Sequence, residues 1–155
     1  MKSIKSFIIA IAIPLGVGGL SAFLTRGNMS EFELINKPPL TPPAILFPIV
    51  WSILYILMGI ASYLVYVSDS TREAKKTALT IYGIQLGFNF FWSILFFNFK
   101  LYFISFAWLF VMWLLIIMTT LVFRAVSGRA SYLMVPYILW VTFAGYLNFY
   151  IFLAN

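Results

Sequence analysis

Five long apolar segments occupy most of this sequence. Each is long enough to cross about 30 Å of hydrocarbon as a helix, which takes roughly 20 residues. Nothing in the chain resembles the alternating pattern of membrane β-strands. We therefore predict an all-α membrane protein, in which residues 1–155 form one domain of five transmembrane helices at 6–25, 43–67, 78–97, 101–123 and 131–153.

The composition supports the same conclusion. Hydrophobic residues make up 63% of the chain and charged residues 9%, whereas about a quarter of a soluble domain is charged. The chain has no Cys and no His, so it lacks the common metal ligands and the usual general base. We expect no metal site, no required cofactor and no conventional catalytic centre.

The net charge of +6 comes from basic residues near the ends of the apolar segments. This placement argues for orientation in a bilayer and against nucleic-acid binding. With five spans, seven Lys or Arg residues fall on the N-terminal side and three on the other. Since Lys and Arg accumulate in cytoplasmic loops, we expect the N-terminus in the cytoplasm and the C-terminus outside. A cleaved signal peptide is a weaker reading of the first segment, because "GGLSAFLTRG" is a poor cleavage site.

The stretch "NKPPLTPPAILFPIVWSILY", residues 36–55, holds five prolines. Proline fixes φ and lacks a backbone donor, so a run of prolines makes a stiff, non-helical segment. We predict that the loop 26–42, which includes Pro42, lies over the mouth of a cavity; a mere linker is the alternative. Pro43 should begin the second helix, and Pro48 should kink or loosen that helix just before Trp51.

The third span has two different faces. Gly83 and Gly87 lie four residues apart, and Phe90 and Ile94 continue that face. This spacing is typical of helices that approach closely in membranes. We predict a homodimer interface here; chance or packing within one chain is the alternative. The other face carries polar and aromatic residues, among them Asn89, whose amide should face the bundle interior and either join helices or orient a ligand.

Aromatic and amide side chains share faces of the second, third and fifth spans. At 1.5 Å per residue, Trp51 and Asn89 lie about 12 Å and Trp140 about 20 Å from the same membrane surface, which is too deep for an interfacial aromatic belt. We therefore predict a cavity for a flat, mainly apolar ligand, with a plain aromatic core as the alternative. Its candidate residues are Pro42, Trp51, Tyr55, Asn89, Trp92, Tyr137, Trp140, Ala144, Leu147 and Asn148.

Three stretches resemble the signatures of a known family: "KPPLTPPAILFPIVWSILYILMGIASYLV", "QLGFNFFWSILFF" and "PYILWVTFAGYLNFYIF". Their order and spacing are similar to those of the TspO/MBR family. The resemblance implies a dimeric five-helix bundle in a membrane, here a bacterial plasma membrane, that binds porphyrins such as protoporphyrin IX and isoquinoline carboxamides. It also implies that Trp51, Trp140, Asn89, Ala144 and the Leu147–Asn148 pair line the cavity, and that Gly83 and Gly87 form the dimer contact.

The chain departs from the family pattern at two places. Leu40 stands where many relatives have a tryptophan, and no basic residue follows Tyr146 or Tyr150 to complete a cholesterol motif. Three functions remain open: a porphyrin receptor or carrier, light- and oxygen-dependent porphyrin breakdown with Trp51 and Trp140 as redox partners, or an assembly protein without a ligand.

Overall fold

The computed structural model describes residues 4–155, and over this range it contains five helices long and apolar enough to cross a membrane. This confirms the all-α architecture. Each predicted span has its helix, although several bounds differ by three to six residues. The five helices are α1 (Ile4–Thr25), α3 (Leu46–Tyr66), α4 (Arg72–Ser93), α5 (Tyr102–Val126) and α6 (Gly128–Ala154).

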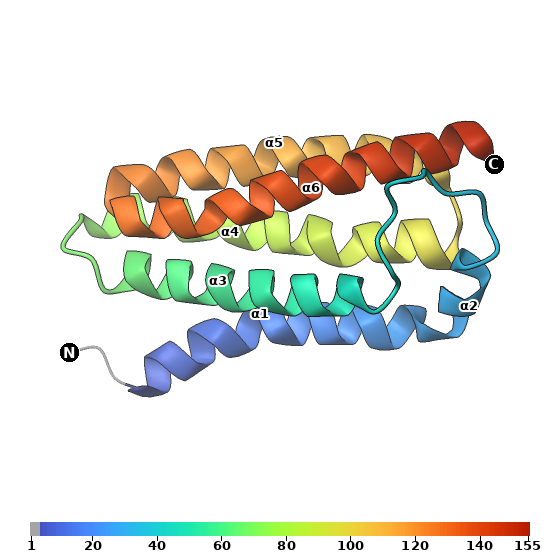
Figure 1. Cartoon of the computed structure of the whole chain (residues 1–155). Helices are drawn as coiled ribbons and strands as arrows, with labels where there is room; N and C mark the ends of the chain where they lie inside the picture. Colours follow the sequence, from blue (N-terminus) through green and yellow to red (C-terminus); the bar gives the residue numbers. More distant parts are fainter. Residues whose placement is uncertain (1–3) are drawn as a thin grey trace.

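The helices form a closed ring in which chain order is not spatial order. Helix α1 packs on α3, α3 on α6, α6 on α5, α5 on α4, and α4 returns to α1. The start of α1, the α3–α4 connection and the α5–α6 connection lie at one end of the bundle (Figure 1). The C-terminus lies at the other end, the same end as α2 (Met29–Phe32), as five spans require.

The connections are short at the end where α1 begins. Thr71 accepts a hydrogen bond from the Ala74 N–H at the start of α4 (3.1 Å), and Ser127 accepts one from the Ala130 N–H at the start of α6 (3.3 Å). These side chains satisfy backbone donors that a helix start leaves free. At the opposite end, α4 continues into a π-helical turn, η2 (Ile94–Asn98), before Lys100 turns the chain with a φ of 52°.

Residues 26–45, which we call the cap, differ from the predicted loop. They begin with the short helical turns η1 (Arg26–Asn28) and α2, so the segment is not wholly extended. Helix α3 begins at Leu46 rather than at Pro43, which places Pro48 in its first turn. A missing N–H there costs no helical hydrogen bond, so α3 runs unbroken past Trp51 and the kink expected at Pro48 does not occur.

Glycines bring α1 and α3 unusually close. A Cβ at Gly59 of α3 would lie 2.6 Å from the Cα of Ile11 and 2.7 Å from the carbonyl oxygen of Ala10. In a helix this carbonyl would accept a hydrogen bond from the N–H of residue 14. That residue is Pro14, which has no backbone N–H. In return, a Cβ at Gly18 of α1 would overlap the ring of Tyr55. The backbone of α1 therefore packs over Gly59 of α3, and the Tyr55 ring of α3 packs over Gly18 of α1. This close packing makes α1 one wall of the bundle interior.

Candidate ligand cavity

A cavity of about 250 Å³ lies inside the ring at the cap end. Helices α1, α3, α4 and α6 and the turn η2 form its walls, and the cap contributes Met29, Phe32, Glu33 and Ala44. The other half of the interior is filled by side chains such as Val65, Phe123 and Met134, which are buried. The interior is thus solid at one end and hollow at the other.

Seven of the ten predicted ligand residues line this cavity. They come from three helices that are distant in sequence but meet in the ring. They are Trp51 and Tyr55 of α3, Trp92 of α4, and Trp140, Ala144, Leu147 and Asn148 of α6. The structure therefore brings together side chains that the sequence assigned to one site, while their binding of a ligand stays a prediction.

Asn89, Tyr137 and Pro42 do not line the cavity. Asn89 lies behind Tyr55: the Tyr55 hydroxyl donates to Asn89 Oδ1 (2.7 Å), and Asn89 Nδ2 donates to the Tyr137 hydroxyl (2.8 Å). The Tyr137 hydroxyl in turn donates to Gln85 Oε1 (2.6 Å). A buried amide needs partners, and here the protein supplies them. This chain of hydrogen bonds closes the inner side of the cavity.

Asn148 lines the cavity, but its amide is also engaged within the protein. Its Oδ1 accepts hydrogen bonds from Trp92 Nε1 (3.0 Å) and from the Ser105 hydroxyl (3.2 Å). Its Nδ2 donates to the backbone carbonyl of Tyr102 (2.9 Å). Asn148 therefore ties α4, α5 and α6 together, and holds the Trp92 ring at the cavity wall.

The indoles of Trp51 and Trp140 meet at the same wall. The Trp51 ring stacks on Tyr55, with centroids 5.6 Å apart, and meets the Trp140 ring edge to face at 6.4 Å. The Trp140 Nε1 atom is buried, and no residue among 4–155 accepts its hydrogen bond. Because this atom has almost no accessible surface, it does not open onto the cavity, and the Trp140 ring meets the cavity with its carbon atoms.

Sequence reasoning missed the contribution of α1. Gly18, Ser21, Ala22 and Thr25 line the cavity. They are spaced three, one and three residues apart, so all four lie on one helix face. Four small residues along one face are a detectable signal that this side of α1 leaves room for something else.

Comparisons with known proteins agree with this architecture. The TspO/MBR family model matches residues 10–153. The chain belongs to the TspO/MBR family. It is 36% identical to the "Tryptophan-rich protein TspO" of Chlorobaculum tepidum, over 99% of this chain and 98% of that protein. It is 33% identical to the "Protein CrtK" of Rhodobacter capsulatus, over 89% and 85%, and 33% identical to the "Translocator protein" of Bos taurus, over 85% and 79%. It is therefore a multi-pass integral membrane protein.

Polar contacts hold the cap of this TspO/MBR protein in place. Asn155 accepts a hydrogen bond from the Asn36 N–H (3.1 Å) and donates to the Asn36 carbonyl (3.0 Å). On the other side, Asn28 Nδ2 donates to Asn98 Oδ1 (2.7 Å), and Lys100 forms an ion pair with Glu31. These contacts join the cap to the ends of α6 and α4, and most of them face water.

The glycine face of α4 is open. Gly83 and Gly87 are exposed, and a Cβ built on either would have no neighbouring atom within 4 Å. Phe90 and Ile94, on the same face, are partly buried. Packing within one chain therefore does not explain the Gly83–Gly87 pair, and the surface is available to a second helix.

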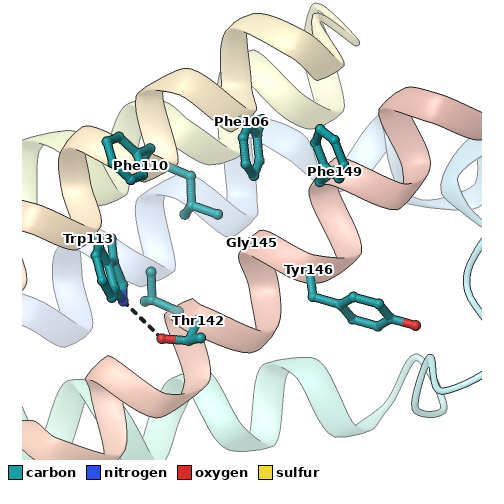
Figure 2. A pocket seen from close by; sticks show the side chains of 9 residues that line it. Phe106, Phe110, Trp113, Thr142, Gly145, Tyr146 and Phe149 are labelled. Atoms are coloured by element: carbon teal, nitrogen blue, oxygen red, sulfur yellow. Dashed lines mark hydrogen bonds between the residues drawn. The ribbon is translucent and has the colours of Figure 1, made fainter.

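A second hollow lies on the outer face of the bundle, between α5 and α6 (Figure 2). It measures about 340 Å³ and is lined mostly by aromatic and aliphatic residues. Figure 2 shows Trp113 of α5 reaching Thr142 of α6, and its Nε1 donates to the Thr142 hydroxyl (2.9 Å). Trp113 and Thr142 satisfy each other, so the Tyr146 hydroxyl is the remaining polar side-chain group of a mainly apolar groove.

Proposed function

We propose that this TspO/MBR protein is a membrane receptor or carrier that binds a flat, mainly apolar molecule in the inner cavity. Protoporphyrin IX and isoquinoline carboxamides are the expected ligand types. One observation carries the proposal: the rings of Trp51, Tyr55 and Trp140 line the cavity and pack against one another. Aromatic walls with a few convergent polar groups are typical of sites for such ligands.

The size of the cavity adds a condition. Its volume of about 250 Å³ lies just below the range of about 300–1,000 Å³ for sites that hold drug-sized ligands. A porphyrin is at the large end of this class, so its binding requires the walls to move. The cap is the wall held by polar contacts at the bundle end, and we expect Phe32 and Glu33 to move outward.

A titration tests the proposal. Purified protein is titrated with protoporphyrin IX, and the quenching of tryptophan fluorescence is followed. Trp140→Ala removes a ring that lines the cavity, so affinity should fall about twofold to tenfold, as expected from about 0.5–1.5 kcal/mol for one aromatic contact. Trp113→Ala, which removes an indole from the outer groove, is the matched control and should bind as the wild type does.

Two results would overturn the proposal. The first is unchanged affinity in a folded Trp51→Ala, Trp140→Ala double variant, because this would place the ligand elsewhere. The second is the absence of porphyrin and carboxamide binding by the wild type, which would favour a protein that assembles with partners and needs no small ligand.

Light- and oxygen-dependent breakdown of the porphyrin is a second candidate. It is favoured by the position of Trp51. The centroid of its ring lies within 6.4 Å of the ring centroids of Tyr55, Tyr137 and Trp140. Oxidisable rings so close together suit electron transfer to a photoexcited ligand. Irradiation of the complex in air should then give a new absorbing product. If Trp51→Phe binds porphyrin and forms product at the wild-type rate, this indole is not a redox partner.

We also propose a homodimer through the face of Gly83, Gly87, Phe90 and Ile94. The open surface over the two glycines supports it, because close approach of helices needs small residues and free space. Chemical crosslinking in membranes tests it, and a chain that stays monomeric at all protein-to-lipid ratios would refute it.

The orientation is proposed from charge. The end of the bundle where α1 begins carries four exposed basic residues, Arg72, Lys76, Arg124 and Arg129. This supports an orientation in which that end faces the cytoplasm, in a bacterial plasma membrane. Since the chain has no Cys, single cysteines at Ser70 and at Asn155 give a clean test. An impermeant thiol reagent added to intact cells should label the second and spare the first.

A further inference from the structure

The mouth of the cavity carries one acidic side chain. Among the residues that line the cavity, Glu33 is the only one with a formal charge. The Glu33 side chain is exposed. Among residues 4–155, the ion pair at this end of the bundle joins Lys100 to Glu31 and does not include Glu33. A ligand in the cavity therefore lies next to a carboxylate that has no salt-bridge partner.

The cations of the cap do not line the cavity. Lys37 donates to the backbone carbonyls of Phe32 (2.9 Å), Glu33 (3.1 Å) and Ile35 (3.3 Å), and its ammonium lies over the Phe32 ring. It thus caps the C-terminal end of α2 and does not line the cavity. Arg26 lies over the Phe23 ring and is also outside the lining.

We propose that Glu33 sets the charge preference of the cavity. It favours ligands that are uncharged or cationic at the end facing the cap, and it disfavours those with a carboxylate there. The reason is Coulomb repulsion, which is stronger at the edge of an apolar cavity than in bulk water. This inference rests on the proposed function. It predicts that esters or amides of a flat ligand bind better than the free acid.

Two porphyrins that differ only in charge provide the test. Protoporphyrin IX carries two carboxylates, and its dimethyl ester carries none. Glu33→Gln should tighten the binding of the acid about threefold to tenfold at low salt, as expected for the loss of repulsion by one partly exposed charge. The gain should shrink in 0.5 M NaCl, because salt screens exposed charges. The affinity for the ester should not change.

Glu73→Gln is the matched control. It removes the same charge from an exposed glutamate in the first turn of α4, at the opposite end of the bundle. Its affinities for both porphyrins should equal those of the wild type. This comparison separates the local effect of Glu33 from a change in net charge.

The outcomes distinguish this inference from the proposed function. If both porphyrins bind but Glu33→Gln leaves the affinity for the acid unchanged, or raises both affinities equally, the charge preference is refuted and the cavity proposal stands. If neither porphyrin binds to the wild type, the proposed function fails and the inference fails with it.

Discussion

Gly59→Ala tests whether the close contact of α1 and α3 shapes the cavity. The added methyl group would lie 2.6 Å from the Cα of Ile11, whereas ordinary van der Waals contact begins at 3.4 Å. Since the nearest atoms belong to the backbone of α1 and not to a flexible side chain, the helix itself must move outward by about 0.8 Å. Overpacking of this kind costs about 1–3 kcal/mol of unfolding free energy.

The expected result is a lower thermal unfolding midpoint for the protein in detergent. With about 2–4 °C per kcal/mol for a chain of this length, the midpoint should fall by about 2–12 °C. Helix α1 also carries Gly18, Ser21, Ala22 and Thr25 of the cavity wall. The shift should therefore change the affinity for a cavity ligand as well, even though Gly59 does not line the cavity.

Gly16→Ala provides the control. A Cβ at Gly16 of the same helix has no neighbour within 4 Å, so this change should leave the midpoint unchanged or raise it slightly, because alanine is a better helix former than glycine. An equal effect of Gly16→Ala and Gly59→Ala would refute the reasoning, since helix propensity and not the α1–α3 contact would then explain both.

Three further predictions concern the cap, the inner hydrogen bonds and the open face. Asn155→Ala removes both hydrogen bonds to the Asn36 backbone. Amide hydrogen exchange in residues 33–41, measured by mass spectrometry, should become about tenfold faster, which corresponds to a loss of about 1.4 kcal/mol in the opening free energy of the cap. Exchange in the core should not change. Asn89→Leu leaves the Tyr55 hydroxyl without its partner and should cost about 1–3 kcal/mol in denaturant unfolding; a neutral result would contradict the network. Gly87→Leu should abolish the dimer in light scattering yet keep the monomer folded, since Gly87 is exposed and a Cβ there has no neighbour within 4 Å.

The sequence predicted the parts of this fold that depend on residue type and spacing. Trp51 and Tyr55 are four residues apart, and Trp140, Ala144 and Leu147 follow the same helical spacing, so their common faces could be read directly. All five line the cavity. The apolar lengths of the spans likewise predicted five helices, because hydrocarbon leaves a backbone few alternatives.

Other features depend on small rotations and offsets that spacing does not determine. Asn89 was expected either to join helices or to orient a ligand, and its helix turns it toward Tyr55 and Tyr137, each of which forms one hydrogen bond with its amide. A rotation of α4 by part of a turn decides between these outcomes. Similarly, in a helix that begins at residue 43, Pro48 removes a helical hydrogen bond and should kink or loosen the helix. In a helix that begins at Leu46, Pro48 lies in the first turn and removes no helical hydrogen bond. The start of a helix was the weakest part of the prediction, and the proline argument depended on it.

Tyr55 connects the walls of the cavity in a way that determines how a ligand gains access. Its ring fills the space over Gly18, its face stacks on Trp51, and its hydroxyl donates to Asn89. Helices α1, α3 and α4 are thus locked together in the hydrocarbon, where no water competes for the hydrogen bond. The contacts of the cap are exposed, and water does compete for them. Opening the cap therefore costs less than separating two helices, and we expect ligands to reach the cavity from the aqueous end of the bundle.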